Sequence, residues 1–68
     1  MRTNNRDAIT ELDQRIAIVR DNLRELIEQA SAYSGAASEE VAAERIAQQE
    51  AQLAALLKER EDLLNASS

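Results

Sequence analysis

The sequence contains no cysteine, no histidine and no proline, and Tyr33 is its one aromatic residue. The lack of cysteine and histidine excludes a disulfide framework and the common zinc sites. It also removes the usual general base and the thiol nucleophile of enzymes. Neither a glycine-rich phosphate loop nor a helical Glu-x-x-His motif is present. We therefore expect no enzyme activity, no cofactor and no bound metal, although a site made of carboxylates alone stays open as a minor alternative.

Excess positive charge and long apolar runs are lacking too. The net charge of −5 disfavours nonspecific attraction to nucleic-acid phosphates and to anionic membranes. No apolar run approaches the roughly 18 residues that span a bilayer. The first residues, Met1–Asp7, lack the apolar core of a secretory signal. We expect a cytoplasmic protein with no membrane partner.

The length of 68 residues leaves room for one domain, 1–68. A hydrophobic core of this size is marginal and usually needs a disulfide, a metal or a partner chain. Because the first two are excluded, a partner chain is expected. The composition is rich in alanine, leucine, glutamate, arginine and glutamine, which are strong helix formers and are typical of a coiled coil or long helix.

Apolar side chains in the first half of the chain recur at alternating steps of three and four residues. They are Ile9, Leu12, Ile16, Val19, Leu23, Leu26, Ala30 and Tyr33. This spacing predicts an amphipathic helix with a coiled-coil seam. Asn4 or Asn5 is a suitable N-cap, and Asp7 then falls in the first turn, near the positive helix end. The predicted helix covers about residues 5–33.

The second half carries a broader apolar stripe, which Gln49 and Arg60 interrupt. Its members are Ala42, Ile46, Leu53, Leu56, Leu57, Leu63 and Leu64. Ser38 is a suitable N-cap, and acidic residues follow it in the first turn. The predicted second helix covers about residues 39–65.

The two stripes are about two residues out of phase, so one straight helix would carry them on different faces. The slip coincides with Gly35, and glycine is the preferred residue just past a helix end. A turn at residues 34–38 therefore reverses the chain. The predicted fold is all-α: an antiparallel two-helix hairpin in which Leu23 lies near Ile46 and Ile16 near Leu53.

The second stripe is wider than one facing helix can cover. We expect two hairpins to dimerise into a four-helix bundle, and a complex with another helical protein would bury the same side chains. The third interpretation is that the extra leucines are simply exposed and have no partner, since isolated exposed leucines are common on protein surfaces. Tyr33 either packs over the last core layer or anchors a partner, and Gln49 fixes helix register or contacts the partner. The predicted interface comprises Ile18, Ile27, Tyr33, Gln49, Leu57 and Leu64.

Arginines form a stripe beside the first seam, at Arg2, Arg6, Arg20 and Arg24. Such a stripe could contact phosphates, so the alternative function is a regulatory nucleic-acid-binding hairpin. Asp13 interrupts the stripe, and the hairpin brings Arg20 level with Glu50. We therefore favour ion pairs that flank the seam. The Arg60 stem can cover Ile9 while its guanidinium reaches water or a carboxylate such as Asp13. The predicted function is a small non-catalytic structural or adaptor protein that acts through helix–helix contacts, foremost with itself.

Overall fold

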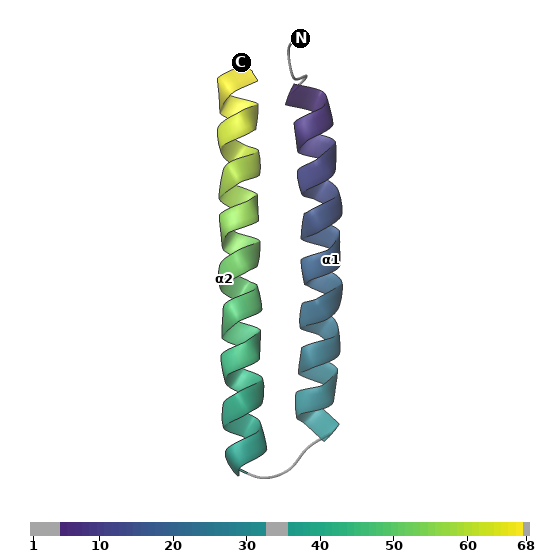
Figure 1. Ribbon diagram of the computed structural model, residues 1–68, viewed down its shortest axis with the longest axis vertical. Helices are drawn as coiled ribbons and strands as arrows, with labels where there is room; N and C mark the ends of the chain where they lie inside the picture. Colours follow the sequence, from purple (N-terminus) through teal and green to yellow (C-terminus); the bar gives the residue numbers. More distant parts are fainter. Residues whose placement is uncertain (1–4, 33–35, 68) are drawn as a thin grey trace.

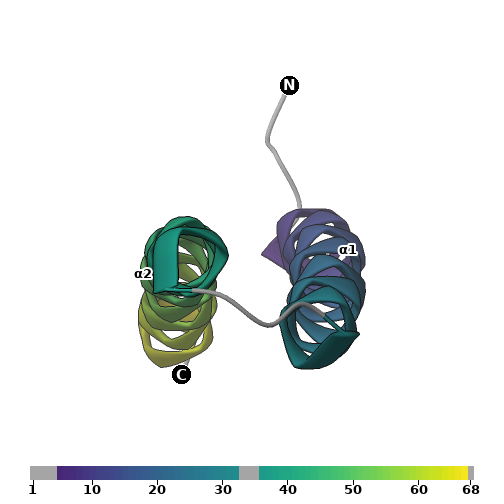
Figure 2. The same cartoon turned by 90° about the horizontal axis from the view of Figure 1, so that it is seen from below.

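The computed structural model describes residues 5–32 and 36–67, and both segments are α-helices. α1 comprises Asn5–Ala32 and α2 comprises Ala36–Ser67. The helices pack against each other in antiparallel orientation, so the start of α1 lies beside the end of α2 (Figure 1). They also lie side by side in the view along their length (Figure 2). The predicted helical hairpin is confirmed.

The helix boundaries differ from the predicted ones by up to three residues. α1 ends at Ala32, and α2 begins at Ala36 and continues to Ser67. Ser38 therefore lies inside α2, so its prediction as the N-cap is wrong; the alanines before it favour helix and extend α2 backwards. The start of α1 at Asn5 puts Asp7 in the first turn, as expected. Residues 33–35, including Tyr33 and Gly35, lie outside the described residues.

The hydrophobic core lies along the line where the two helices meet. Leu12, Ile16, Val19 and Leu56 are buried, and Leu23, Leu53 and Leu63 pack against them while partly exposed. All of these residues belong to the two predicted seams, so the sequence periodicity identified the core. No described side chain is completely buried, because each helix has only one neighbour. The hairpin thus has a contact line rather than an enclosed interior.

The molecule is a rod with dimensions of 53 × 18 × 15 Å. Its radius of gyration of 15.7 Å exceeds the value of about 11 Å expected for a globular domain of this length. The exposed surface is 5484 Å², about 1,200 Å² above the roughly 4,200 Å² that a folded monomer of this mass exposes. The excess surface lies on the long sides of the helices, where a partner could cover it.

Candidate interaction surface

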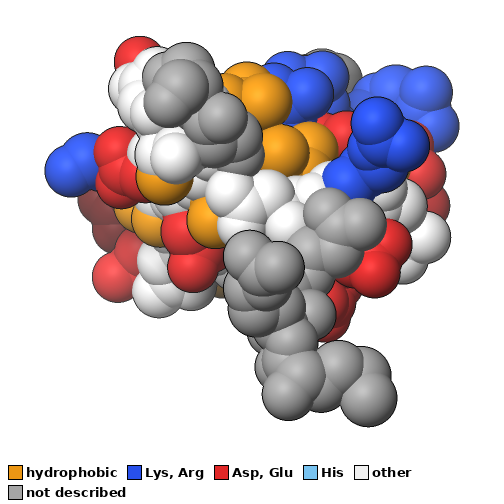
Figure 3. Space-filling model, turned by 90° about the horizontal axis from the view of Figure 1, so that it is seen from above, with side chains coloured by type: hydrophobic (Ala, Val, Ile, Leu, Met, Phe, Trp, Pro, Cys, Tyr) orange, Lys and Arg blue, Asp and Glu red, His pale blue; other side chains and the backbone are white. Residues whose placement is uncertain are grey.

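Five large aliphatic side chains are exposed among the described residues. They are Ile18 (59% exposed), Ile27 (52%), Val41 (49%), Leu57 (39%) and Leu64 (43%). All residues of this set except Val41 were predicted from the sequence as interface residues. Val41 was missed because it stands apart from the apolar stripe of α2. Seen from the end where α1 starts and α2 stops, hydrophobic side chains lie uncovered between the charged groups (Figure 3).

Leu57 and Leu64 each follow a leucine that contributes to the core. Neighbouring residues of a helix point about 100° apart. Leu56 is buried and Leu63 packs against the core, so the leucine that follows each of them points away from the contact line. Since Leu57 and Leu64 are seven residues apart, they lie almost above each other on α2.

Two shallow grooves mark one edge of the hairpin. The first has a volume of about 250 Å³ and is lined by Asn22, Glu25, Leu26, Gln29, Arg45, Gln48 and Gln49. The second has a volume of about 180 Å³ and is lined by Ala8, Glu11, Leu12, Arg15, Glu59 and Leu63. Arg15 and Asn22 are seven residues apart and lie on the same side of α1. We call this side of the hairpin the groove edge.

Ile18 and Val41 belong to the groove edge. Ile18 comes four residues before Asn22, and Val41 comes four residues before Arg45, so each lies about one turn from a side chain that lines the first groove. The surroundings of Ile18 are polar, since Asn22 and Arg15 are its neighbours on the helix surface. Neither Ile18 nor Val41 therefore extends a continuous apolar surface.

Ile27, Leu57 and Leu64 lie on the opposite edge, which we call the leucine edge. Nine residues separate Ile27 from Ile18, which places the two on opposite sides of α1. Leu57 likewise lies almost opposite Glu59 of the groove edge, since two residues correspond to about 200° of rotation. The two isoleucines that were predicted together as interface residues thus belong to different edges.

Gln49 lies at the rim of the contact line and borders the first groove. Its side-chain Oε1 is buried without a hydrogen-bond partner among the described residues. Its Nε2 donates a long hydrogen bond of 3.5 Å to Oε1 of Gln52, one turn further along α2. A buried oxygen without a partner destabilises the hairpin, so Gln49 is a polar residue that packing alone does not explain.

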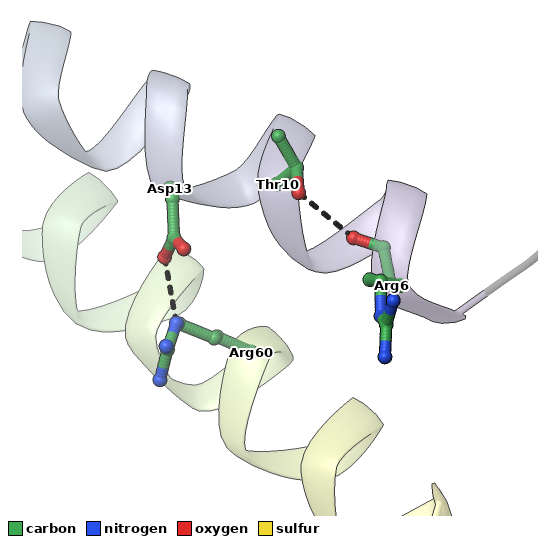
Figure 4. A network of polar contacts seen from close by, with 4 residues as sticks. All are labelled: Arg6, Thr10, Asp13 and Arg60. Carbon is green, nitrogen blue, oxygen red and sulfur yellow. Dashed lines mark hydrogen bonds and ion pairs between the residues drawn. The ribbon is translucent and has the colours of Figure 1, made fainter.

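One ion pair connects the two helices among the described residues. Arg60 Nε donates to Asp13 Oδ1 at 2.6 Å (Figure 4). From the sequence, Arg60 was expected to reach water or a carboxylate such as Asp13, and the structure shows the carboxylate. The nearby Thr10 Oγ1 donates its hydrogen bond to the backbone oxygen of Arg6 in the preceding turn and not to the carboxylate of Asp13 (Figure 4). The pair is partly exposed and stabilises the hairpin little, but it favours this register over others.

The described members of the arginine stripe, Arg6, Arg20 and Arg24, are exposed. Arg24 donates to Asp21 of its own helix at 3.1 Å, and Arg15, on the groove edge, pairs with Glu11 at 3.0 Å. Arg20 and Glu50 are both described and exposed, yet they form no ion pair with each other. The expected pair between them within one chain is therefore wrong, and both side chains are exposed to solvent. Arg2 lies outside the described residues.

The described residues provide no group of three or more acidic side chains that could hold a metal ion. Neither α1 nor α2, over the residues described, has a segment long and apolar enough to cross a membrane. Comparison with known proteins finds no family model that matches the chain, and no similar curated protein or solved structure. The surface itself thus carries what can be inferred about function.

Proposed function

We propose that this chain is a small, non-catalytic cytoplasmic protein that acts through helix–helix contacts, foremost by self-association into a four-helix bundle. The observation that carries the proposal is the excess of exposed surface together with the large aliphatic side chains on it. If each of two copies covered its excess of about 1,200 Å², the interface would total about 2,400 Å². This area lies within the range of obligate homodimers, about 2,000–5,000 Å².

The predicted interface residues support the proposal to different degrees. Ile27, Leu57 and Leu64 lie on the leucine edge and expose enough apolar surface to gain from a partner, since burial of such a side chain contributes about 1.5–3 kcal/mol. Ile18 is exposed among polar neighbours on the groove edge and supports the proposal less. Gln49 is suited to selecting one register, as a polar residue at a core-facing position does in coiled coils. A second helical protein would bury the same side chains, and it is the alternative partner.

Sedimentation equilibrium of the full chain over a series of concentrations tests self-association. We expect a dimer at micromolar concentration, with a monomer appearing only on dilution. A monomer at all concentrations up to the highest that is soluble would contradict self-association. The helix–helix function would then require a different protein as the partner.

The arginine stripe supports the second candidate, nucleic-acid binding. Arg20 and Arg24 are exposed on one side of α1, but Asp21 pairs with Arg24 and Asp13 lies in the same stripe. Phosphate binding by arginines would weaken with salt. A salt-sensitive mobility shift of labelled RNA or DNA, lost in the Arg20→Glu, Arg24→Glu double variant, would favour this candidate. We expect no shift even at low salt, because the net charge of −5 opposes it.

A further inference from the structure

The leucine edge carries a second coiled-coil seam on each helix, beside the one that forms the hairpin core. Steps of four and three residues connect Ile9, Asp13, Ile16, Arg20, Leu23, Ile27 and Ala30 on α1, and Ile46, Glu50, Leu53, Leu57, Arg60 and Leu64 on α2. Such alternating steps keep side chains on one face of a helix. We call these residues the leucine-edge seam. It shares Ile16, Leu23 and Leu53 with the core and adds the exposed aliphatic side chains.

The same spacing drawn along the groove edge gives a polar surface. Its rows are Ala8, Leu12, Arg15, Val19, Asn22, Leu26 and Gln29 on α1, and Arg45, Gln49, Gln52, Leu56, Glu59 and Leu63 on α2. Of its large apolar members, Leu12, Val19 and Leu56 are already buried in the hairpin, and Leu26 and Leu63 are partly buried. A partner on the groove edge would cover mostly polar side chains. Hydrophobic burial therefore favours the leucine edge.

The charged residues of the leucine-edge seam are two acids and two bases. Asp13 and Arg60 pair with each other within the chain. Arg20 and Glu50 are exposed and form no ion pair in the hairpin, among the interactions of the described residues. Because the chain reverses between Ala32 and Ala36, and Asp13 meets Arg60, Arg20 and Glu50 lie at about the same level along the rod.

We infer that a second copy of this chain docks on the leucine edge about a twofold axis parallel to the helices, so that Arg20 pairs with Glu50 of the second copy. This inference rests on the proposed self-association and specifies its geometry. With the axis parallel to the helices, α1 faces α2 of the second copy at the same level, and every neighbouring helix is antiparallel. The twofold symmetry forms the ion pair twice.

The other twofold arrangement on this edge has its axis perpendicular to the helices. It would bring α1 against α1 and α2 against α2. With that axis at the level of Arg20 and Glu50, near the middle of the rod, Arg20 would face Arg20 of the second copy and Glu50 would face Glu50 of the second copy. Like charges across an interface oppose association, whereas opposite charges select a partner and its orientation. Charge complementarity therefore selects the parallel axis.

Replacement of Leu57 tests which edge is covered. Leu57→Glu should raise the dissociation constant of the dimer at least about 100-fold, because two carboxylates would be buried in an apolar seam. Ile18→Glu is the matched control on the groove edge, with an exposed aliphatic side chain replaced by the same acid. It should change the constant less than about threefold. If Ile18→Glu dissociated the dimer and Leu57→Glu did not, the groove edge would be the interface.

Chemical cross-linking tests the direction of the axis without changing any charge. Ala17 and Ala54 are exposed, lie at the same level, and border the seam on α1 and α2 respectively. The chain has no cysteine of its own. Chains with Ala17→Cys are mixed with differently tagged chains with Ala54→Cys, and a short bis-maleimide is added. We expect the mixed 17–54 product to predominate; predominant 17–17 and 54–54 products, or no product from a dimer, would overturn the arrangement.

A charge exchange tests the ion pair. Arg20→Glu should weaken the dimer about tenfold, since two pairs are lost and two repulsions are created. Adding Glu50→Arg to the same chain should restore the affinity to within about threefold of the original. Arg45→Glu, on the groove edge, makes the same change in net charge and should have little effect. A failure of Glu50→Arg to restore the affinity would contradict the pair while leaving the dimer itself intact. If the unaltered chain were monomeric in sedimentation, self-association and this geometry would both be wrong.

Discussion

Replacing Leu12 by alanine removes one of the four buried side chains of the hairpin. Leu12 is only 6% exposed and packs where α1 and α2 meet. We expect Leu12→Ala to lower the free energy of unfolding by about 2–3 kcal/mol. Three carbon atoms are lost, and each buried methylene contributes about 0.8 kcal/mol.

The cavity contribution should be small at this position. Leu12 also lines the second groove of the groove edge, so the space left by the leucine side chain opens to solvent. This places the effect at the lower end of the range of about 2–5 kcal/mol seen for buried leucines. A chain of this length is stable by only about 3–10 kcal/mol in total. The midpoint of thermal unfolding should therefore fall by about 10–20 °C.

Urea and thermal unfolding followed by far-UV circular dichroism would measure the effect. The control is Ile18→Ala, which truncates a side chain of similar size that is 59% exposed on the same helix. It should change the stability by less than about 1 kcal/mol, because alanine also favours the helix. All chains must be compared at one concentration, since the stability of an oligomer depends on it. Equal losses in Leu12→Ala and Ile18→Ala would refute the assigned core.

Three further predictions address the polar residues. In a double-mutant cycle, Asp13→Asn and Arg60→Gln should show a coupling of about 0.2–1 kcal/mol, small because both side chains are partly exposed; strictly additive effects would exclude the contact. Gln49→Leu should raise the free energy of unfolding by about 1 kcal/mol, and with it the unfolding midpoint, because it removes a buried oxygen without a partner. A lower midpoint would indicate that the amide is satisfied. Raising the salt concentration to about 1 M should weaken the dimer through screening of Arg20 and Glu50, and Arg20→Gln should reduce that dependence.

The two helices and the core between them could be predicted from the sequence because an α-helix has a constant number of residues per turn. Alternating steps of three and four residues identified the core residues, including Leu12 and Leu56, before the structure was known. The register followed from the phase slip at Gly35, and the contact between Asp13 and Arg60 confirms it. Helix ends were less well predicted: Ser38 suggested an N-cap, but the helix-forming alanines before it extend α2 to Ala36.

The division of the exposed side chains between the groove edge and the leucine edge could not be predicted from either helix alone. The helical period places Ile18 and Ile27 on opposite sides of α1, but it does not reveal which side of α2 continues each surface. That depends on the packing of the two helices, which the grooves beside Asn22 and Arg45 establish. For the same reason Arg20 and Glu50 could be placed at one level from the sequence, whereas only the structure shows that they are exposed and form no ion pair with each other.

The adjacent leucines of α2 are the strongest reason to look for a second neighbour of this helix. A helix that packs against α1 alone needs Leu56 and Leu63 on its surface, and it needs no large apolar residue about 100° away from them. Leu57 and Leu64 nevertheless lie there, spaced by seven residues and aligned with each other. The leucine-edge seam combines this spacing with a base and an acid, Arg20 and Glu50, at one level along the rod. If Leu57→Glu left the dimer intact, the spacing would have lost its explanation, and the leucine edge would have to be assigned to a different helical partner.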